Sequence, residues 1–193
     1  MGAAFAAAPF SHRVHLRMKL ACTTCHQAAA TSTNITDNLL PDGQVCKTCH
    51  KQVEIPAPPQ LHIAKFSHAQ HLKMGNAAPV IAAAIDAKTY LSPPGDIRRH
   101  LNGTNPCEAC HRGLQESDKV TQDALPRMAD CLVCHNVIDM PDSCEKCHGK
   151  GASLKPANHA PDFLDTHTSG KLGLDKTTCA VCHGRKFTCL GCH

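Results

Sequence analysis

Every cysteine of this chain lies in one short motif, a Cys-x-x-Cys pair followed directly by histidine. The 193 residues include 14 Cys and 15 His, so the motif takes up all of the thiols and about half of the imidazoles. Thiolates and imidazoles bind soft and borderline metals, and paired thiols can also bond covalently to a cofactor. The seven copies are Cys22/Cys25/His26, Cys46/Cys49/His50, Cys107/Cys110/His111, Cys131/Cys134/His135, Cys144/Cys147/His148, Cys179/Cys182/His183 and Cys189/Cys192/His193.

The order of groups within the motif favours covalent haem attachment. Two thiols about one helical turn apart can add to the two vinyl groups on one edge of a porphyrin. The adjacent histidine then lies beneath the iron as its proximal ligand. We therefore predict seven c-type haems, bound by the 14 cysteines and ligated by His26, His50, His111, His135, His148, His183 and His193.

Zinc is the main alternative, because two converging Cys-x-x-Cys pairs form Cys₄ or Cys₃His sites. Seven pairs leave one without a mate, and zinc does not require a histidine after every pair. With His at 15 of 193 positions, chance would place one after all seven pairs with a probability on the order of 10⁻⁸. A thioredoxin-type redox pair would occur once, in a βαβ unit, so haem is the favoured interpretation.

Eight further histidines remain, and seven haem irons need seven distal ligands. Because the two numbers nearly match, we predict that all but one of these histidines ligate iron and that His62 is the spare. Methionine ligation would raise the potential of a site, but the imidazoles suffice. The predicted distal ligands are His12, His15, His68, His71, His100, His159 and His167.

Four of these histidines belong to an internal repeat. The segment FSHRVHL at residues 10–16 recurs as FSHAQHL at residues 66–72, and Met18 and Met74 follow at the same spacing. Two histidines at positions i and i+3 lie on one side of a helical turn but at different heights. One such segment can therefore serve two haems.

These segments and motifs resemble the class III cytochrome c family, including its trihaem members. In that family a Phe-x-His-x-x-His segment precedes the first Cys-x-x-Cys-His motif, and its two histidines ligate different haems. The resemblance implies that His12, His15, His68 and His71 are distal ligands, with His12 serving the haem on Cys22 and Cys25. Seven haems exceed the three or four of one family module, so the second segment indicates a duplication.

The elements that position these sites are expected to be small. Only 3% of the residues are aromatic and there is no Trp, which is a poor inventory for a core of side chains, whereas porphyrin faces offer large apolar areas to bury. We predict a haem-packed fold that is mostly irregular, with short α-helices and little or no β-sheet. A 56-residue stretch without attachment motifs, 51–106, suggests three parts: an N-terminal dihaem segment (1–55), a linker and helix segment that supplies distal histidines (56–106), and a pentahaem segment (107–193). Within the middle part, residues 77–91 are expected to form a helix.

The net charge and the hydropathy pattern limit the kinds of partner that the chain can have. The formal net charge is +4, but the two propionates of each haem would offset it, so we expect no nucleic-acid partner. No stretch reaches the roughly 18 apolar residues of a membrane span. Residues 1–8 are too short for a full signal peptide, although 6–8 could be the tail of one. Because covalent haem attachment normally follows export, we predict a periplasmic or extracellular location.

The expected function is electron transfer along a chain of low-potential bis-His haems between redox partner proteins in respiration. Two alternatives stay open. A multihaem oxidoreductase would need one iron with an open distal position, and a polymerising cytochrome or a subunit of a membrane-bound respiratory complex would contact copies of itself or that complex. All seven motifs are regular and Tyr90 is the sole tyrosine, so we expect no catalytic residue.

Overall fold

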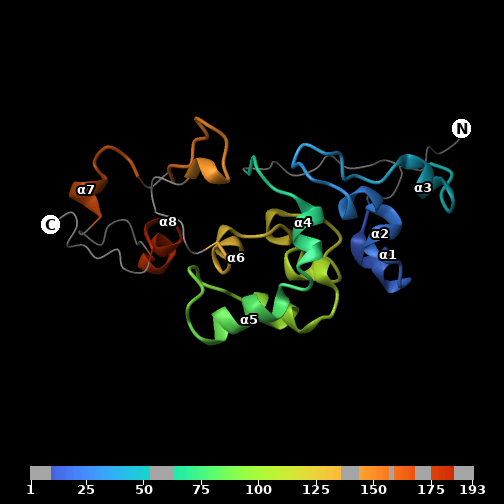
Figure 1. The fold of residues 1–193 in the computed structure, drawn as a ribbon, viewed down its shortest axis with the longest axis horizontal. Coiled ribbons are helices and arrows are strands. Elements are labelled where there is room, and N and C mark those ends of the chain that lie inside the picture. Colours follow the sequence, from blue (N-terminus) through green and yellow to red (C-terminus); the bar gives the residue numbers. More distant parts are fainter. Residues whose placement is uncertain (1–9, 53–62, 136–143, 157–158, 168–174, 185–193) are drawn as a thin grey trace, which may run out of the picture.

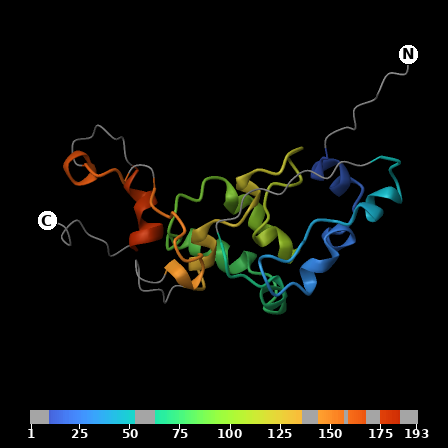
Figure 2. The same cartoon turned by 90° about the horizontal axis from the view of Figure 1, so that it is seen from above.

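The computed structural model describes residues 10–52, 63–135, 144–156, 159–167 and 175–184. The molecule is elongated, with the N-terminal segments at one end and the C-terminal ones at the other (Figures 1 and 2). The predicted roles of His62, Cys189, Cys192 and His193 lie outside the described residues.

Short helices and irregular segments make up the described part of the chain, which has no β-strand. This confirms the predicted fold class. No helix within these ranges is long and apolar enough to cross a bilayer. The α-helices are α1 (His12–Arg17), α2 (Cys22–Cys25), α3 (Gly43–Lys47), α4 (His68–Lys73), α5 (Ala78–Asp86), α6 (Met128–Leu132), α7 (Phe163–Thr166) and α8 (Ala180–His183). The 3₁₀ helices are η1 (Gln27–Ala30), η2 (Ile97–Asn102), η3 (Pro106–Ala109), η4 (Gln122–Ala124), η5 (Cys144–Lys146) and η6 (Lys176–Cys179).

Helices α1 and α4 begin in the same way, as their repeated sequence predicts. Ser11 and Ser67 are extended N-cap residues, and each hydroxyl accepts a hydrogen bond at 3.3 Å from the backbone N–H three residues later. The cap satisfies an N–H group that would otherwise lack a partner at the start of the helix. Both serines are buried, so the entry of each helix is fixed by the surrounding chain.

The middle of the molecule holds a small core of apolar side chains. Helix α5 is expected from the alanine-rich sequence, but it is shorter than the predicted 77–91. It ends at Asp86 because Lys88 adopts a left-handed φ of 57°, and the N–H groups of Thr89 and Tyr90 both bond back to the Ala84 carbonyl. The core consists of Ala78, Ile81, Ala82, Tyr90, Ile97, Leu101, Ala109 and Ala129.

This core joins the segment without attachment motifs to the motifs that follow it. Helix α5 contacts η2 and η3, and Ala109 of η3 is only 1% exposed. The stretch from α5 to η2, which follows α4 in the chain, therefore supports the Cys107 and Cys131 motifs (Figure 1). The three-part division at 55 and 106 stays a prediction.

Candidate haem centres

Each attachment motif, numbered here as sites 1 to 7 in sequence order, forms one helical turn where the structure describes it. In sites 1 to 5 the N–H of the motif histidine donates to the carbonyl of the first cysteine at 2.9 Å, and the sixth site lies on η6 and α8. Polar N-caps start several of these turns, including Asp42, Asn105 and Asp175. The turn brings both thiols to one side and carries the imidazole beside them.

Five motif histidines face a second imidazole from a different segment. In every pair one ring belongs to an attachment motif and the other to a predicted distal ligand. The pairs, with the distances between ring centres, are His12–His26 (6.2 Å), His15–His50 (6.0 Å), His68–His111 (6.4 Å), His71–His135 (6.3 Å) and His159–His183 (6.2 Å).

These distances fit an iron held between the two rings. A bond from a first-row metal to an imidazole nitrogen is about 2 Å long, and that nitrogen lies about 1.2 Å from its ring centre. Two such arms place the ring centres about 6.4 Å apart. The residues present therefore fit a bis-imidazole haem at each of the five described pairs.

Backbone carbonyls set the orientation of several of these rings. His15 Nδ1 donates to the Ser11 carbonyl and His71 Nδ1 to the Ser67 carbonyl, both at 2.8 Å. A ring that donates from Nδ1 keeps the lone pair on Nε2, which is the nitrogen that can ligate iron. The hydrogen bond within the helix thus fixes both the tautomer and the direction of the ligand.

The motif histidines of sites 1 and 3 are held in the same way from outside their turns. His26 Nδ1 donates to the Leu39 carbonyl at 2.7 Å, and His111 Nδ1 donates to the Ala124 carbonyl at 3.1 Å. In both cases the carbonyl lies 13 residues after the histidine. The repeat preserves this 13-residue separation. Because the acceptor is a backbone carbonyl, however, neither the Leu39 nor the Ala124 side chain indicates the role.

Burial favours the neutral form of three of the paired imidazoles, the form that ligation requires. Burial and then the neighbouring His26 lower the pKa of His12 to about 4. Burial and the facing ring likewise lower the pKa of His68, and burial lowers that of His111. Protonation would therefore require a pH below the ordinary range of histidine.

The duplication extends well beyond the Phe-Ser-His segments. Cys22 and Cys46 are 24 residues apart, and so are Cys107 and Cys131. The interplanar angles repeat as well: 12° for the His12–His26 pair and 13° for its counterpart at site 3, and 51° for the His15–His50 pair and 49° for its counterpart at site 4. Sites 1 and 2 and sites 3 and 4 thus repeat one two-site arrangement, and the second copy carries α5 and η2 as an insertion.

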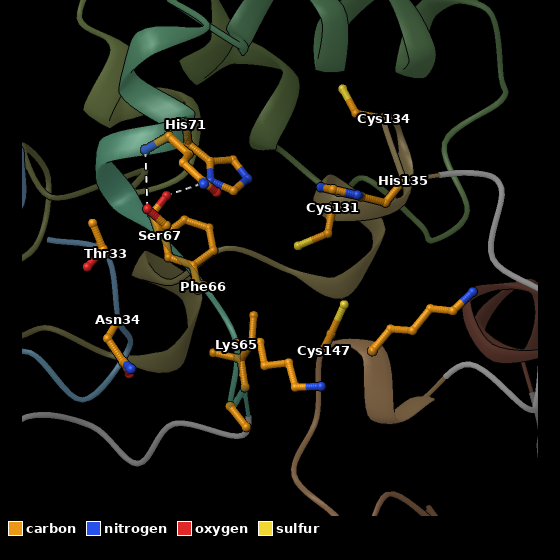
Figure 3. Close-up of a pocket in the computed structure, with 14 residues that line it drawn as sticks. Thr33, Asn34, Lys65, Phe66, Ser67, His71, Cys131, Cys134, His135 and Cys147 are labelled. Carbon is orange, nitrogen blue, oxygen red and sulfur yellow. Dashed lines mark hydrogen bonds between the residues drawn. The ribbon is translucent and has the colours of Figure 1, made fainter.

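The fourth site opens onto a cavity of about 780 Å³ (Figure 3). His71 and His135 line it from α4 and the motif turn, together with Cys131 and Cys134. The Phe66 ring stacks on His71 with centres 4.4 Å apart, as Phe10 does on His15. The cavity therefore offers two thiols, two facing imidazoles and apolar walls, which are the groups that a covalently attached haem needs.

Near the C-terminal end, α7 positions the facing ring for site 6. His159 lies opposite His183 with an interplanar angle of 8°, and the Phe163 ring stacks on His159 at 4.7 Å and on His167 at 5.1 Å. His167 Nδ1 contacts the carbonyls of Phe163 and Leu164. Its predicted role as a distal ligand stays a prediction, as does the role of His148 as the proximal ligand of site 5.

His100 lies in a different environment. It is on η2, beside the carboxylates of Asp96 and Glu116, which are paired with Arg99 at the surface. In the described ranges no second imidazole faces it. His100 is closer in sequence to the third site than His68 is, yet it is His68 that lies opposite His111, the motif histidine of that site.

Neighbouring sites do not follow the order of the sequence. Asn105 joins the first and third sites: its Nδ2 donates to Cys22 Sγ at 3.5 Å, and its Oδ1 accepts from the Cys107 N–H at 3.1 Å. The second site lies on the other side of the first, where burial and then the Cys46 thiol raise the pKa of Cys25. Site 2 is thus the outer member of the N-terminal pair, near the end of the molecule that carries α3 (Figure 1).

The second thiols of sites 2 and 4, Cys49 and Cys134, lie at the surface of the polypeptide, whereas Cys46 is partly covered. The contact given for the Cys49 sulfur is local, with the neighbouring Thr48 hydroxyl at 3.8 Å. Attachment of haem through Cys49 stays a prediction.

The remaining described sites continue in one direction. Cys147 of site 5 lines the cavity of site 4 (Figure 3). Burial, Asp130 and then the Cys110 and Cys147 thiols raise the pKa of Cys131 to about 11, which links sites 3, 4 and 5. Burial and then Cys144 raise the pKa of Cys182, which links sites 5 and 6. Sites 2, 1, 3 and 4 therefore follow one another in space, and sites 5 and 6 border each other and site 4, since α6 of site 4 also contacts α8 of site 6.

Comparisons with known proteins agree with this geometry at the N-terminal end. Residues 8–57 match the family model described as cytochrome c7 and related cytochrome c. Neither the curated proteins nor the solved structures gave a match. The matched segment contains the first two-site unit, with α1 and the motifs of sites 1 and 2. Residues 8–57 are thus a cytochrome c7-like segment, of the kind that carries c-type haem and transfers electrons.

Proposed function

We propose that this protein is a heptahaem c-type cytochrome that carries electrons between redox partners. The observation that carries the proposal is the set of five facing imidazole pairs, each spaced for one iron and each beside two thiols. Sites 5 and 7 are included because their attachment motifs have the same residues and spacing. A haem c at each site would supply one-electron redox chemistry.

The side chains favour electron transfer over catalysis. Two imidazoles on one iron leave no position for a substrate, and ligation by two imidazoles without methionine keeps reduction potentials low. His15 and His71 are held by their own helices, so they resist displacement. The proposed ligands of sites 1 to 4 and 6 therefore close those sites.

We infer that electrons move along the sites in the order 2, 1, 3, 4, 5, 6, with site 7 as the continuation in sequence. Asn105 between Cys22 and Cys107, and Cys147 in the site 4 cavity, support two of these steps. The path thus runs along the long axis of the molecule (Figure 1). Redox proteins would then exchange electrons at its two ends.

The setting follows from the kind of cofactor. Cytochrome c7-like proteins are typically periplasmic, and covalent haem attachment normally follows export. We propose a periplasmic or extracellular role in respiration, with redox partner proteins that include other copies of the chain or a membrane-bound respiratory complex. The haem propionates would be balanced by surface Lys and Arg residues.

Haem counting and potentiometry together test the proposal. The intact mass of the matured protein should exceed that of the polypeptide by seven haems, and an optical redox titration should be reversible and lie at low potential. The reduced protein should bind no carbon monoxide, because in this proposal every iron has two imidazole ligands. Fewer than seven haems, or binding of one carbon monoxide per protein molecule, would contradict the proposal.

A further inference from the structure

A buried ion pair lies between the third and fourth sites. Arg112 and Asp130 are 3% and 7% exposed, and Arg112 Nη2 lies 2.5 Å from Asp130 Oδ2. They are the only buried charged residues in the described part of the chain. The other four ion pairs of these ranges have side chains that are at least 37% exposed.

The pair connects the two attachment motifs directly. Arg112 follows His111 of site 3, and Asp130 precedes Cys131 of site 4. Arg112 Nη1 also donates to the Ala109 carbonyl at 2.6 Å, which ties the guanidinium to the turn of site 3. The ion pair thus fixes one motif turn against the other.

Neutral donors complete the environment of the carboxylate. The Tyr90 hydroxyl donates to Asp130 Oδ1 at 2.9 Å, and the Arg127 N–H donates to Asp130 Oδ2 at 2.7 Å. Burial and then Asp130 raise the pKa of Tyr90 well above its usual value, so this hydroxyl stays protonated and remains a donor. The sole tyrosine of the chain is therefore used to satisfy a buried charge.

Stability alone does not account for this arrangement. Removing two charges from water costs free energy that the attraction between them seldom more than repays, and packed apolar residues often serve the fold as well. Inside a protein, however, a fixed charge acts on its neighbours more strongly than in water. Charges placed between two redox sites therefore change the energy of oxidising each of them.

We propose that the Tyr90–Asp130–Arg112 cluster is a positioning element for electron transfer, which fixes the third and fourth sites against each other and balances the charge between them. The inference rests on the proposed function. Asp130 favours the oxidised iron because its negative charge attracts the added positive charge, and Arg112 disfavours it. With both present the two effects offset each other, so neither site becomes a trap for electrons.

Charge-changing variants separate this role from simple packing. Asp130→Asn should raise the midpoint potentials of the haems at sites 3 and 4, because Arg112 is then uncompensated. Arg112→Gln should lower the same two potentials, and the double variant should bring both back toward the original values. A packing defect has no reason to reverse its sign between the two single variants.

The measurement is an NMR redox titration of the full haem-loaded protein, following the resolved haem methyl signals. Asp118→Asn is the matched control, since Asp118 pairs with Arg13 at the surface, and it should shift these potentials less than Asp130→Asn does. Equal shifts in the control, or shifts of the same sign in both single variants, would overturn the proposal.

Tyr90→Phe covers the case in which the single charge variants fail to mature. It removes a donor to the carboxylate but no charge, so the potentials of the same two haems should fall by less than in Arg112→Gln. Unchanged potentials would overturn the proposal. If the unaltered protein carries fewer haems or does not titrate reversibly, the proposed function fails; if it titrates normally and the variants cause no shift, only this inference fails.

Discussion

At the scale of single residues, backbone carbonyls orient several of the paired imidazoles. His15 and His71 donate from Nδ1 to a carbonyl of their own helix, and His26 and His111 donate to a carbonyl 13 residues later. Such partners set both the tautomer and the basicity of a ligand. One ring of each pair at sites 1 to 4 is therefore fixed by the backbone.

Replacing His71 with Ala should open one iron without releasing its haem. Cys131 and Cys134 hold the cofactor covalently, so the haem count by intact mass should stay at seven. The site should become high-spin and bind carbon monoxide, which an optical difference spectrum measures. Loss of the haem, or an unchanged spectrum, would contradict the pairing of His71 with His135.

The sequence predicts that His100 is a distal haem ligand, whereas its surroundings in the structure do not, and a substitution at this position distinguishes the two. Because it lies beside Asp96 and Glu116 and no imidazole of the described ranges faces it, His100→Ala should leave every haem low-spin, with His62 as the seventh distal ligand in its place. If His100 is a distal ligand, as its position before Cys107 predicts, the variant should show one high-spin haem. The same spectrum therefore decides between the two assignments.

At the scale of elements, two short helices carry much of the organisation. Helices α1 and α4 have six residues each, which is too short to be stable in isolation. Each begins at a buried serine cap and presents two histidines one turn apart. The caps and the packing of Phe10 and Phe66 on the imidazoles hold these helices in place.

Ser67→Ala should lower the free energy of unfolding of the haem-loaded protein by about 1 kcal/mol, the usual cost of losing an N-cap. The hydroxyl accepts from the Gln70 N–H and also donates to the Ser32 carbonyl. Chemical denaturation followed by circular dichroism measures the change. Ser153→Ala, at an exposed position, is the control, and equal stabilities of the two variants would contradict the role of the cap.

The repeated FSHRVHL and FSHAQHL segments allowed both helices and the presence of paired histidines to be predicted from sequence. The partner of His68 could not be predicted in the same way. Its counterpart His12 is 10 residues before its motif, whereas His68 is 39 residues before Cys107. The inserted α5 and η2 pack in one core with Ala109 and Ala129 of the following motif regions, and only the structure shows that this insertion leaves the ring geometry unchanged.

At the scale of the whole molecule, the sites form a line whose order differs from that of the motifs. Local spacing predicts that sites 1 and 2 are neighbours, because His12 and His15 share one helix. It does not predict that site 1, rather than site 2, meets site 3 through Asn105. Long-range packing between the two copies of the two-site unit decides that order.

Removing site 1 should isolate site 2 from the rest of the path. A ruthenium photosensitiser attached at Gln44→Cys on α3 would inject an electron at site 2. In the full protein the electron should move away, so that recombination with the oxidised label is slow. With Cys22→Ala/Cys25→Ala recombination should become fast.

Removing site 6 with Cys179→Ala/Cys182→Ala is the matched control, because that site is distant from α3 (Figure 1). Recombination should stay slow in this variant. Equal recombination rates in the two deletions would contradict the order 2, 1, 3, 4, 5, 6.

Low-temperature electron paramagnetic resonance of the fully oxidised protein tests the central claim most directly. All seven haems should be low-spin. The signals should fall into at least two groups, because three described imidazole pairs are nearly parallel, at 8° to 13°, and two are tilted by about 50°. A high-spin component equal to about one haem in seven would contradict a fully closed bis-imidazole cytochrome.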